Sequence, residues 1–161
     1  MRFPGTTMVL HADSPHPDHL IAELPQWNTA ENDVDGRDWI GMKGSYDLAI
    51  GYSLIFWPTF HVVGGCVRTG AWTAEDIARA KPVPQAERRH VEALHNHIHM
   101  ADLHLNDGSL TEARARYLGR TLKAIYEVKL KADFPDRSFT VYFADEPDLD
   151  ILEYQLTFWQ N

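Results

Sequence analysis

The chain of 161 residues has a single cysteine, Cys66, so it cannot form an internal disulfide. Disulfide-rich secreted scaffolds are therefore excluded, and one thiol fits a reducing compartment. Long hydrophobic runs are also lacking, because the longest, Leu54–Trp57, is far shorter than the ~20 residues of a membrane-spanning helix. Residues 1–13 lack the long apolar stretch of a secretory signal. We expect a cytoplasmic protein without a membrane partner.

Positive charge is scarce as well. The chain has 15 Lys and Arg against 23 Asp and Glu, a net charge of −8. Proteins that bind nucleic acid usually carry clustered positive charge, so a nucleic acid is not expected as a partner. Phosphate-binding loops, dinucleotide fingerprints and nucleophile elbows are also missing. What remains is an ordinary composition, 44% hydrophobic and 24% charged, which is typical of one globular domain with or without an arm.

The composition of residues 1–45 predicts an irregular N-terminal arm. These residues hold four of the nine prolines, Pro4, Pro15, Pro17 and Pro25. Proline fixes φ and lacks an N–H, so a long helix or a central strand is disfavoured here. Trp27 and Trp39 are costly to leave in water. We therefore expect these two side chains to pack the arm against a single domain formed by residues 46–161.

Alternating apolar residues predict four strands in two pairs. The first pair is 46–57 with 60–68, and Gly64-Gly65 predicts a turn or bulge within it. The second pair is 139–144 with 152–158, joined by the acidic connection 145–150. Each pair is expected to form an antiparallel hairpin, because neither contains a helical crossover.

Apolar residues at three- and four-residue steps predict two long helices. One runs from about Gln85 to Leu105, and the other follows a capping box at Ser109 and Glu112 and ends at Phe134. A short helix is expected after Thr73. Together these elements predict an α+β fold of two layers, in which an antiparallel four-stranded sheet of two hairpins carries both long helices on one face.

Histidines are concentrated in one predicted helix, since five of the nine fall within residues 90–104. At 100° per residue, Glu92, His95, His99 and Asp102 lie within about 80° of arc on one face. Imidazole and carboxylate groups at this spacing can bind a divalent ion such as Zn²⁺ or Fe²⁺. The same pattern also fits structural histidines at the border between core and solvent.

The histidine pattern matches no metal motif in full. A zincin requires Glu directly after the first histidine, and Asn96 stands after His95. Glu92 and His95 match half of a di-iron site, but the second helix offers no matching pair. His97 and His99 match half of a metal-hydrolase motif that belongs to a loop. The metal site is therefore an expectation from spacing alone.

Three other features have simple structural interpretations. The acidic connection 145–150 is typical of a solvated hairpin loop, although acidic loops can also bind Ca²⁺ or a basic partner. Cys66 lies in a predicted strand and is expected to be a small buried residue rather than a nucleophile. A basic face on the second long helix is typical of solvated helices. It consists of Arg116, Arg120, Lys123 and Lys131.

Two classes of function remain open. The absence of every strong catalytic motif favours a small acidic, non-catalytic binding or protein-interaction module, whose partner is another protein and which needs no cofactor. The alternative is a metal-dependent, hydrolase-like enzyme that uses the histidine-rich helix with Zn²⁺ or Fe²⁺ as cofactor. No catalytic residue can be named from the sequence, and the oligomeric state stays open.

Overall fold

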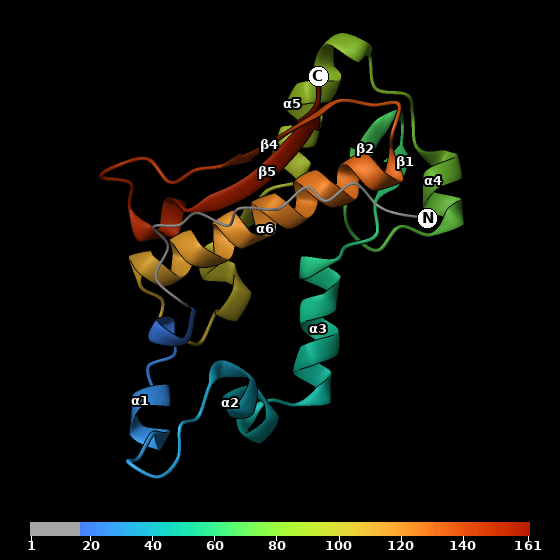
Figure 1. Cartoon of the computed structure of the whole chain (residues 1–161). Helices are drawn as coiled ribbons and strands as arrows, with labels where there is room; N and C mark the ends of the chain where they lie inside the picture. The colour runs from blue at the N-terminus through green and yellow to red at the C-terminus, as the bar shows by residue number, and fades with distance from the viewer. Residues whose placement is uncertain (1–16) are drawn as a thin grey trace, which may run out of the picture. The chain divides into compact units, whose positions relative to one another are not determined.

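The computed structural model describes residues 17–161 of the chain (Figure 1). Within that range the α-helices are α1 (Leu24–Trp27), α2 (Gly36–Lys43), α3 (Tyr46–Phe56), α4 (Ala74–Arg79), α5 (Gln85–His95) and α6 (Glu112–Asp133). The strands are β1 (His61–Val63), β2 (Cys66–Arg68), β3 (Ile98–His99), β4 (Phe139–Phe143) and β5 (Gln155–Gln160). The 3₁₀ helices are η1 (Pro17–Leu20), η2 (Met100–His104) and η3 (Ile151–Glu153). None of the helices between residues 17 and 161 is long and apolar enough to cross a membrane.

The chain divides into two compact units at Gly44 and Ser45. In the first unit, η1, α1 and α2 are short, and α2 begins at a capping box formed by Asp35 and Asp38. Lys43 lies over the Trp27 ring, 5.3 Å from its centroid. Pro4 and Pro15 lie outside the described residues. The packing of an arm on the domain through Trp27 and Trp39 stays a prediction.

The second unit is built around a three-stranded antiparallel sheet in the order β3-β5-β4. Val141 of β4 is paired with Phe158 of β5, so the predicted C-terminal hairpin is confirmed. Helix α6 is also confirmed, although its N-cap is Thr111 rather than Ser109. Helix α4 begins at Thr73 with a capping box, as its sequence indicates.

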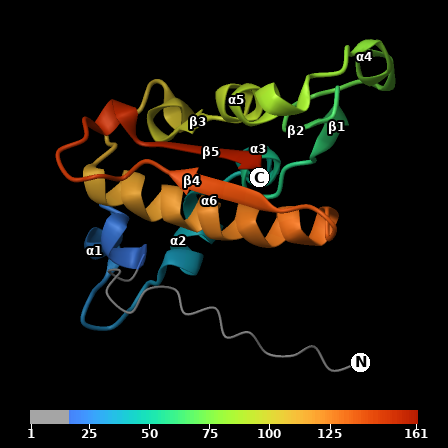
Figure 2. The same ribbon diagram turned by 90° about the horizontal axis from the view of Figure 1, so that it is seen from above.

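The two long helices lie on opposite faces of this sheet (Figure 2). The Thr157 hydroxyl donates to the Ala93 carbonyl of α5 at 2.8 Å. The next residue, Phe158, points the other way and packs against Tyr126 of α6, with ring centroids 6.1 Å apart. The prediction of both helices on one face is therefore wrong. Its error follows from the side-chain alternation of β5, which buries residues on both faces.

The predicted four-stranded sheet is also wrong, because β1 and β2 form a separate sheet of two strands. β1 and β2 pair with each other across Gly64-Gly65, whose φ values of 61° and 90° suit glycine in a tight turn. Residues 46–57, expected as a strand, form helix α3. The Ser45 side chain accepts from the Leu48 N–H and starts that helix, a local signal that outweighs an alternation in which both faces are apolar.

The helix expected over 85–105 ends at His95. Asn96 is 1% exposed, and its side chain bonds to the backbone of β2 and β5 rather than continuing the helix. Ile98 then pairs with Leu156 of β5 as the short strand β3. Because these contacts join residues far apart in the chain, helical periodicity alone could not reveal where the helix ends.

Helix α6 packs closely on β4 at Gly119. A Cβ at this position would overlap the ring of Phe143, which is buried. Gly119→Ala is therefore expected to destabilise the fold by about 1–3 kcal/mol through overpacking. In an uncrowded helix the same change would stabilise the fold by about 1 kcal/mol. A lower urea midpoint for Gly119→Ala therefore supports overpacking, and a higher midpoint contradicts it. Gly108→Ala, where the added methyl meets nothing within 4 Å, is the control and should leave the midpoint unchanged.

Candidate functional site

The predicted metal ligands do not share a helix face. Glu92 and His95 lie on α5, whereas His99 lies in β3 and Asp102 in η2. Across residues 17–161, no group of three or more His, Cys, Asp or Glu side chains is placed to hold a metal ion. The helical geometry that motivated the site is thus not observed. Metal binding itself stays a prediction that only a measurement can test.

Glu92 is completely buried and serves as a hydrogen-bond acceptor. Its carboxylate accepts from the Val67 backbone N–H at 2.6 Å and from the Gln160 backbone N–H at 2.6 Å. The Gln160 side-chain amide donates to it as well. One carboxylate therefore joins α5 to β2 and β5.

Cys66 is buried next to Glu92. Burial raises the pKa of the Cys66 thiol, and the charge of Glu92 raises it further. Cys66 is therefore the buried, inert residue that its position in the sequence indicates.

Asn96 completes this buried polar network. Its side-chain amide donates to the Val67 carbonyl at 2.9 Å and to the Phe158 carbonyl at 3.4 Å, and its oxygen accepts from the Thr69 N–H at 3.3 Å. The network satisfies backbone groups of β2, β5 and Thr69 that no regular ladder pairs. Glu92 and Asn96 therefore have a structural role, and both would have to leave their partners to bind a metal.

Two histidines beyond α5, His97 and His99, bond to backbone carbonyls. The Nδ1 of His99 faces the Leu152 carbonyl at 3.0 Å, and the Nδ1 of His97 faces the Leu94 carbonyl. Because a carbonyl only accepts, each Nδ1 carries a proton and donates it to that carbonyl. The pKa of His95 is lowered by partial desolvation and then by the positive charges of Arg68 and His97. These rings match the structural interpretation of the histidine-rich segment.

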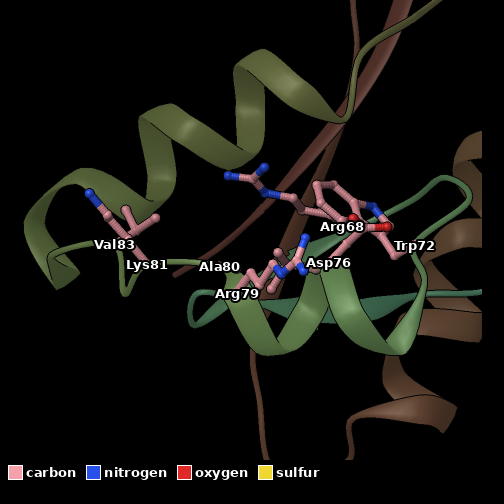
Figure 3. A pocket seen from close by; sticks show the side chains of 8 residues that line it. Arg68, Trp72, Asp76, Arg79, Ala80, Lys81 and Val83 are labelled. Carbon is pink, nitrogen blue, oxygen red and sulfur yellow. The ribbon is translucent and has the colours of Figure 1, made fainter.

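An open pocket of about 320 Å³ lies between β1, β2 and α4 (Figure 3). The Arg68 guanidinium lies 5.5 Å from the centroid of the Trp72 ring on one side. Asp76 bonds to Thr73 as part of the α4 cap, and this bond lowers the pKa of the Asp76 carboxyl. Arg79 pairs with a glutamate of its own helix, and the lining residues include no Ser, Cys or His. The lining therefore holds no Ser–His or Cys–His pair of the kind used in nucleophilic catalysis.

Helix α3 presents the most unusual surface of the second unit. Four large side chains lie within about 80° of arc, and we call them the α3 stripe. They are Tyr46 (91% exposed), Ile50 (63%), Leu54 (71%) and Trp57 (59%). Trp57 directly follows the last helical residue as its C-cap. On the other side of the helix, Ile55 and Phe56 pack against the core. In Figure 1, α3 runs away from α6 and the sheet.

Sequence reasoning missed the α3 stripe because residues 46–57 were assigned to a strand. The signal that could have found it is Ser45, an N-cap residue three positions before Leu48. Read with helical spacing, positions 46, 50, 54 and 57 fall on one face. That face carries no charge, which is unusual for the exposed side of a helix.

A substitution of Glu92 tests whether this residue has a structural role or is a metal ligand. Glu92→Ala leaves the Val67 and Gln160 N–H groups buried without an acceptor, so we expect a loss of about 3–5 kcal/mol in the free energy of unfolding. Excess EDTA should leave the melting temperature of the wild type unchanged. Glu87→Ala, at an exposed position of the same helix, is the control. A wild type that EDTA destabilises to the level of Glu92→Ala would instead show a metal at this residue.

Comparison with family models, curated proteins and solved structures finds no match for this chain. The assignment of a function therefore depends on the residues and distances of the chain itself. Among them, the buried side chains of Glu92 and Asn96 have structural partners, and the pocket lining holds no Ser–His or Cys–His pair. The α3 stripe is the feature of the described residues that the fold leaves without an explanation.

Proposed function

We propose that this chain is a non-catalytic protein-interaction module, which binds another protein chain through the α3 stripe. The observation that carries the proposal is the exposure of four large apolar side chains on one helix face. Covering a large apolar side chain contributes about 1.5–3 kcal/mol, so a partner with a matching apolar surface gains most of its binding free energy here.

The exposed area of the α3 stripe is at the upper end of what isolated proteins show. Taking about 200 Å² for a fully exposed side chain of this size, the four side chains present roughly 570 Å² of apolar surface. Leu48 and Tyr52 are 51% and 36% exposed but lie on the opposite face of the helix. The largest apolar patch of a typical monomer is roughly 300–600 Å², and patches of this size are often functional. The size of the stripe therefore favours a partner.

Helix α3 is also held in a fixed orientation on its own unit. The Tyr126 hydroxyl donates to the Ile55 carbonyl at 3.0 Å, and the Tyr52 hydroxyl is hydrogen-bonded to the His104 ring. The Ser45 cap fixes its first turn. A surface that is already ordered loses little conformational entropy on binding, so more of the apolar gain contributes to affinity.

A photo-crosslinking amino acid tests this proposal in the cells that produce the protein. With benzoylphenylalanine in place of Ile50, irradiation should join the chain to another protein chain, and Leu54→Asp in the same chain should suppress the adduct. Leu152, which is 62% exposed on η3, is the matched control position and should give none. Equal labelling at both positions, or no protein adduct at position 50, would contradict the proposed function.

A further inference from the structure

The α3 stripe is complementary to itself. Its two ends are aromatic, Tyr46 and Trp57, and its middle is aliphatic, Ile50 and Leu54. When two copies of α3 run antiparallel, Ile50 of each faces Leu54 of the other, and Tyr46 of each faces Trp57 of the other. Aliphatic side chains then meet aliphatic ones, and the aromatic rings meet at both ends of the contact, an arrangement that adds about 0.5–1.5 kcal/mol per ring pair. A twofold axis between the two helices generates this contact.

The charges at the ends of the stripe favour the same orientation. Asp47 follows Tyr46 at the start of α3 and is exposed. At the other end, the Lys129 ammonium lies 5.0 Å from the centroid of the Trp57 ring, buried and paired with Asp133 of its own helix. An antiparallel pair keeps the two Asp47 carboxylates at opposite ends of the contact, whereas a parallel pair brings them together. Because each chain carries a net charge of −8, avoiding a further like-charge contact matters for association.

The small residues beside the stripe permit a close approach. Ala49 and Ser53 flank it on one side, and Gly51 lies on the other with nothing within 4 Å of an added Cβ. Small residues let helix backbones come within the 8–10 Å of packed helices. The roughly 570 Å² of the α3 stripe is about two thirds of the ~800 Å² per partner of a stable interface. One copy of α3 therefore supplies most of one side.

From these three observations we infer that the chain covering the α3 stripe is a second copy of this protein, docked as a twofold dimer with the two α3 helices antiparallel. The inference rests on the proposed function and names its partner. Each copy covers the stripe of the other, so the exposed apolar surface of the single chain is absent from the assembly.

Sedimentation velocity of the purified full-length protein tests the dimer. Between about 1 and 100 µM, which brackets a micromolar Kd, the sedimenting mass of the wild type should rise from the 18.4 kDa of one chain toward twice that value. Ile50→Asp and Leu54→Asp should each sediment as monomers with an unchanged circular dichroism spectrum, because the exposed positions carry no core packing. Leu152→Asp, at an equally exposed site on η3, should remain dimeric.

The orientation has its own test in two single-cysteine substitutions. Mixed Ile50→Cys and Leu54→Cys chains should form disulfide-linked heterodimers under mild oxidation, and neither variant should link to itself as fast. Faster linkage of Ile50→Cys to itself would indicate parallel helices and overturn the antiparallel dimer. Cys66 is buried and does not compete.

Failure of the dimer and failure of the proposed function are distinguishable. A wild type that is monomeric at every concentration, or an Ile50→Asp variant that stays dimeric, overturns this inference. If the wild type is monomeric and Ile50 still crosslinks to a different protein in cells, the protein-interaction function stands and only its partner changes. If position 50 yields no adduct at all, both proposals fail.

Discussion

The arrangement of the second unit depends on one buried carboxylate. Glu92 brings a charge into the interior, and it is tolerated there because backbone N–H groups of two strands and a side-chain amide donate to it. These bonds hold the β1–β2 hairpin, α5 and β5 in one place. The cost of leaving such a group without partners is several kcal/mol, so alternative packings of these three elements are strongly disfavoured.

The fixed position of the hairpin determines what α3 can do. Since β1 begins only five residues after α3 ends, the last turn of the helix must lie near the core. Ile55 and Phe56 accordingly pack against it, while the preceding turns extend beyond the core and expose their apolar side chains. The network therefore fixes the hairpin that follows α3, and the Tyr126 hydroxyl bond to the Ile55 carbonyl fixes the last turn of the helix.

Local signals in the sequence were sufficient for part of this fold. The Thr73 cap, the Gly64-Gly65 turn, the apolar stripe of α6 and the alternation of β4 and β5 each act over a few residues, and each was predicted correctly in kind. The end of α5 could not be predicted, because Asn96 leaves the helix for partners 29 and 62 residues away. The assignment of α3 failed because a segment that is apolar on both faces satisfies a period of two as well as helical spacing.

The candidate site was the hardest part to predict for the same reason. Glu92, His95, His99 and Asp102 share a face only if the helix continues, and its early end separates them. The surface that replaces them as the functional candidate consists of residues whose apolar character was visible, but whose exposure depends on tertiary structure. No short sequence motif predicts whether a side chain is exposed. Only the folded chain shows that the α3 stripe, Tyr46, Ile50, Leu54 and Trp57, faces outward.

Hydrogen exchange of the α3 amides tests the central claim, that a second copy covers this helix, most directly. An 11-residue helix packed on one side only exchanges its amides faster than one that is also covered on its exposed face, because short helices gain most of their stability from packing. The account predicts that exchange over residues 46–56 slows as protein concentration rises through the dimerisation range, and that Ile50→Asp removes this dependence while α6 exchanges as before. Exchange of α3 that is equally fast at all concentrations, and equal in the wild type and Ile50→Asp, would contradict it.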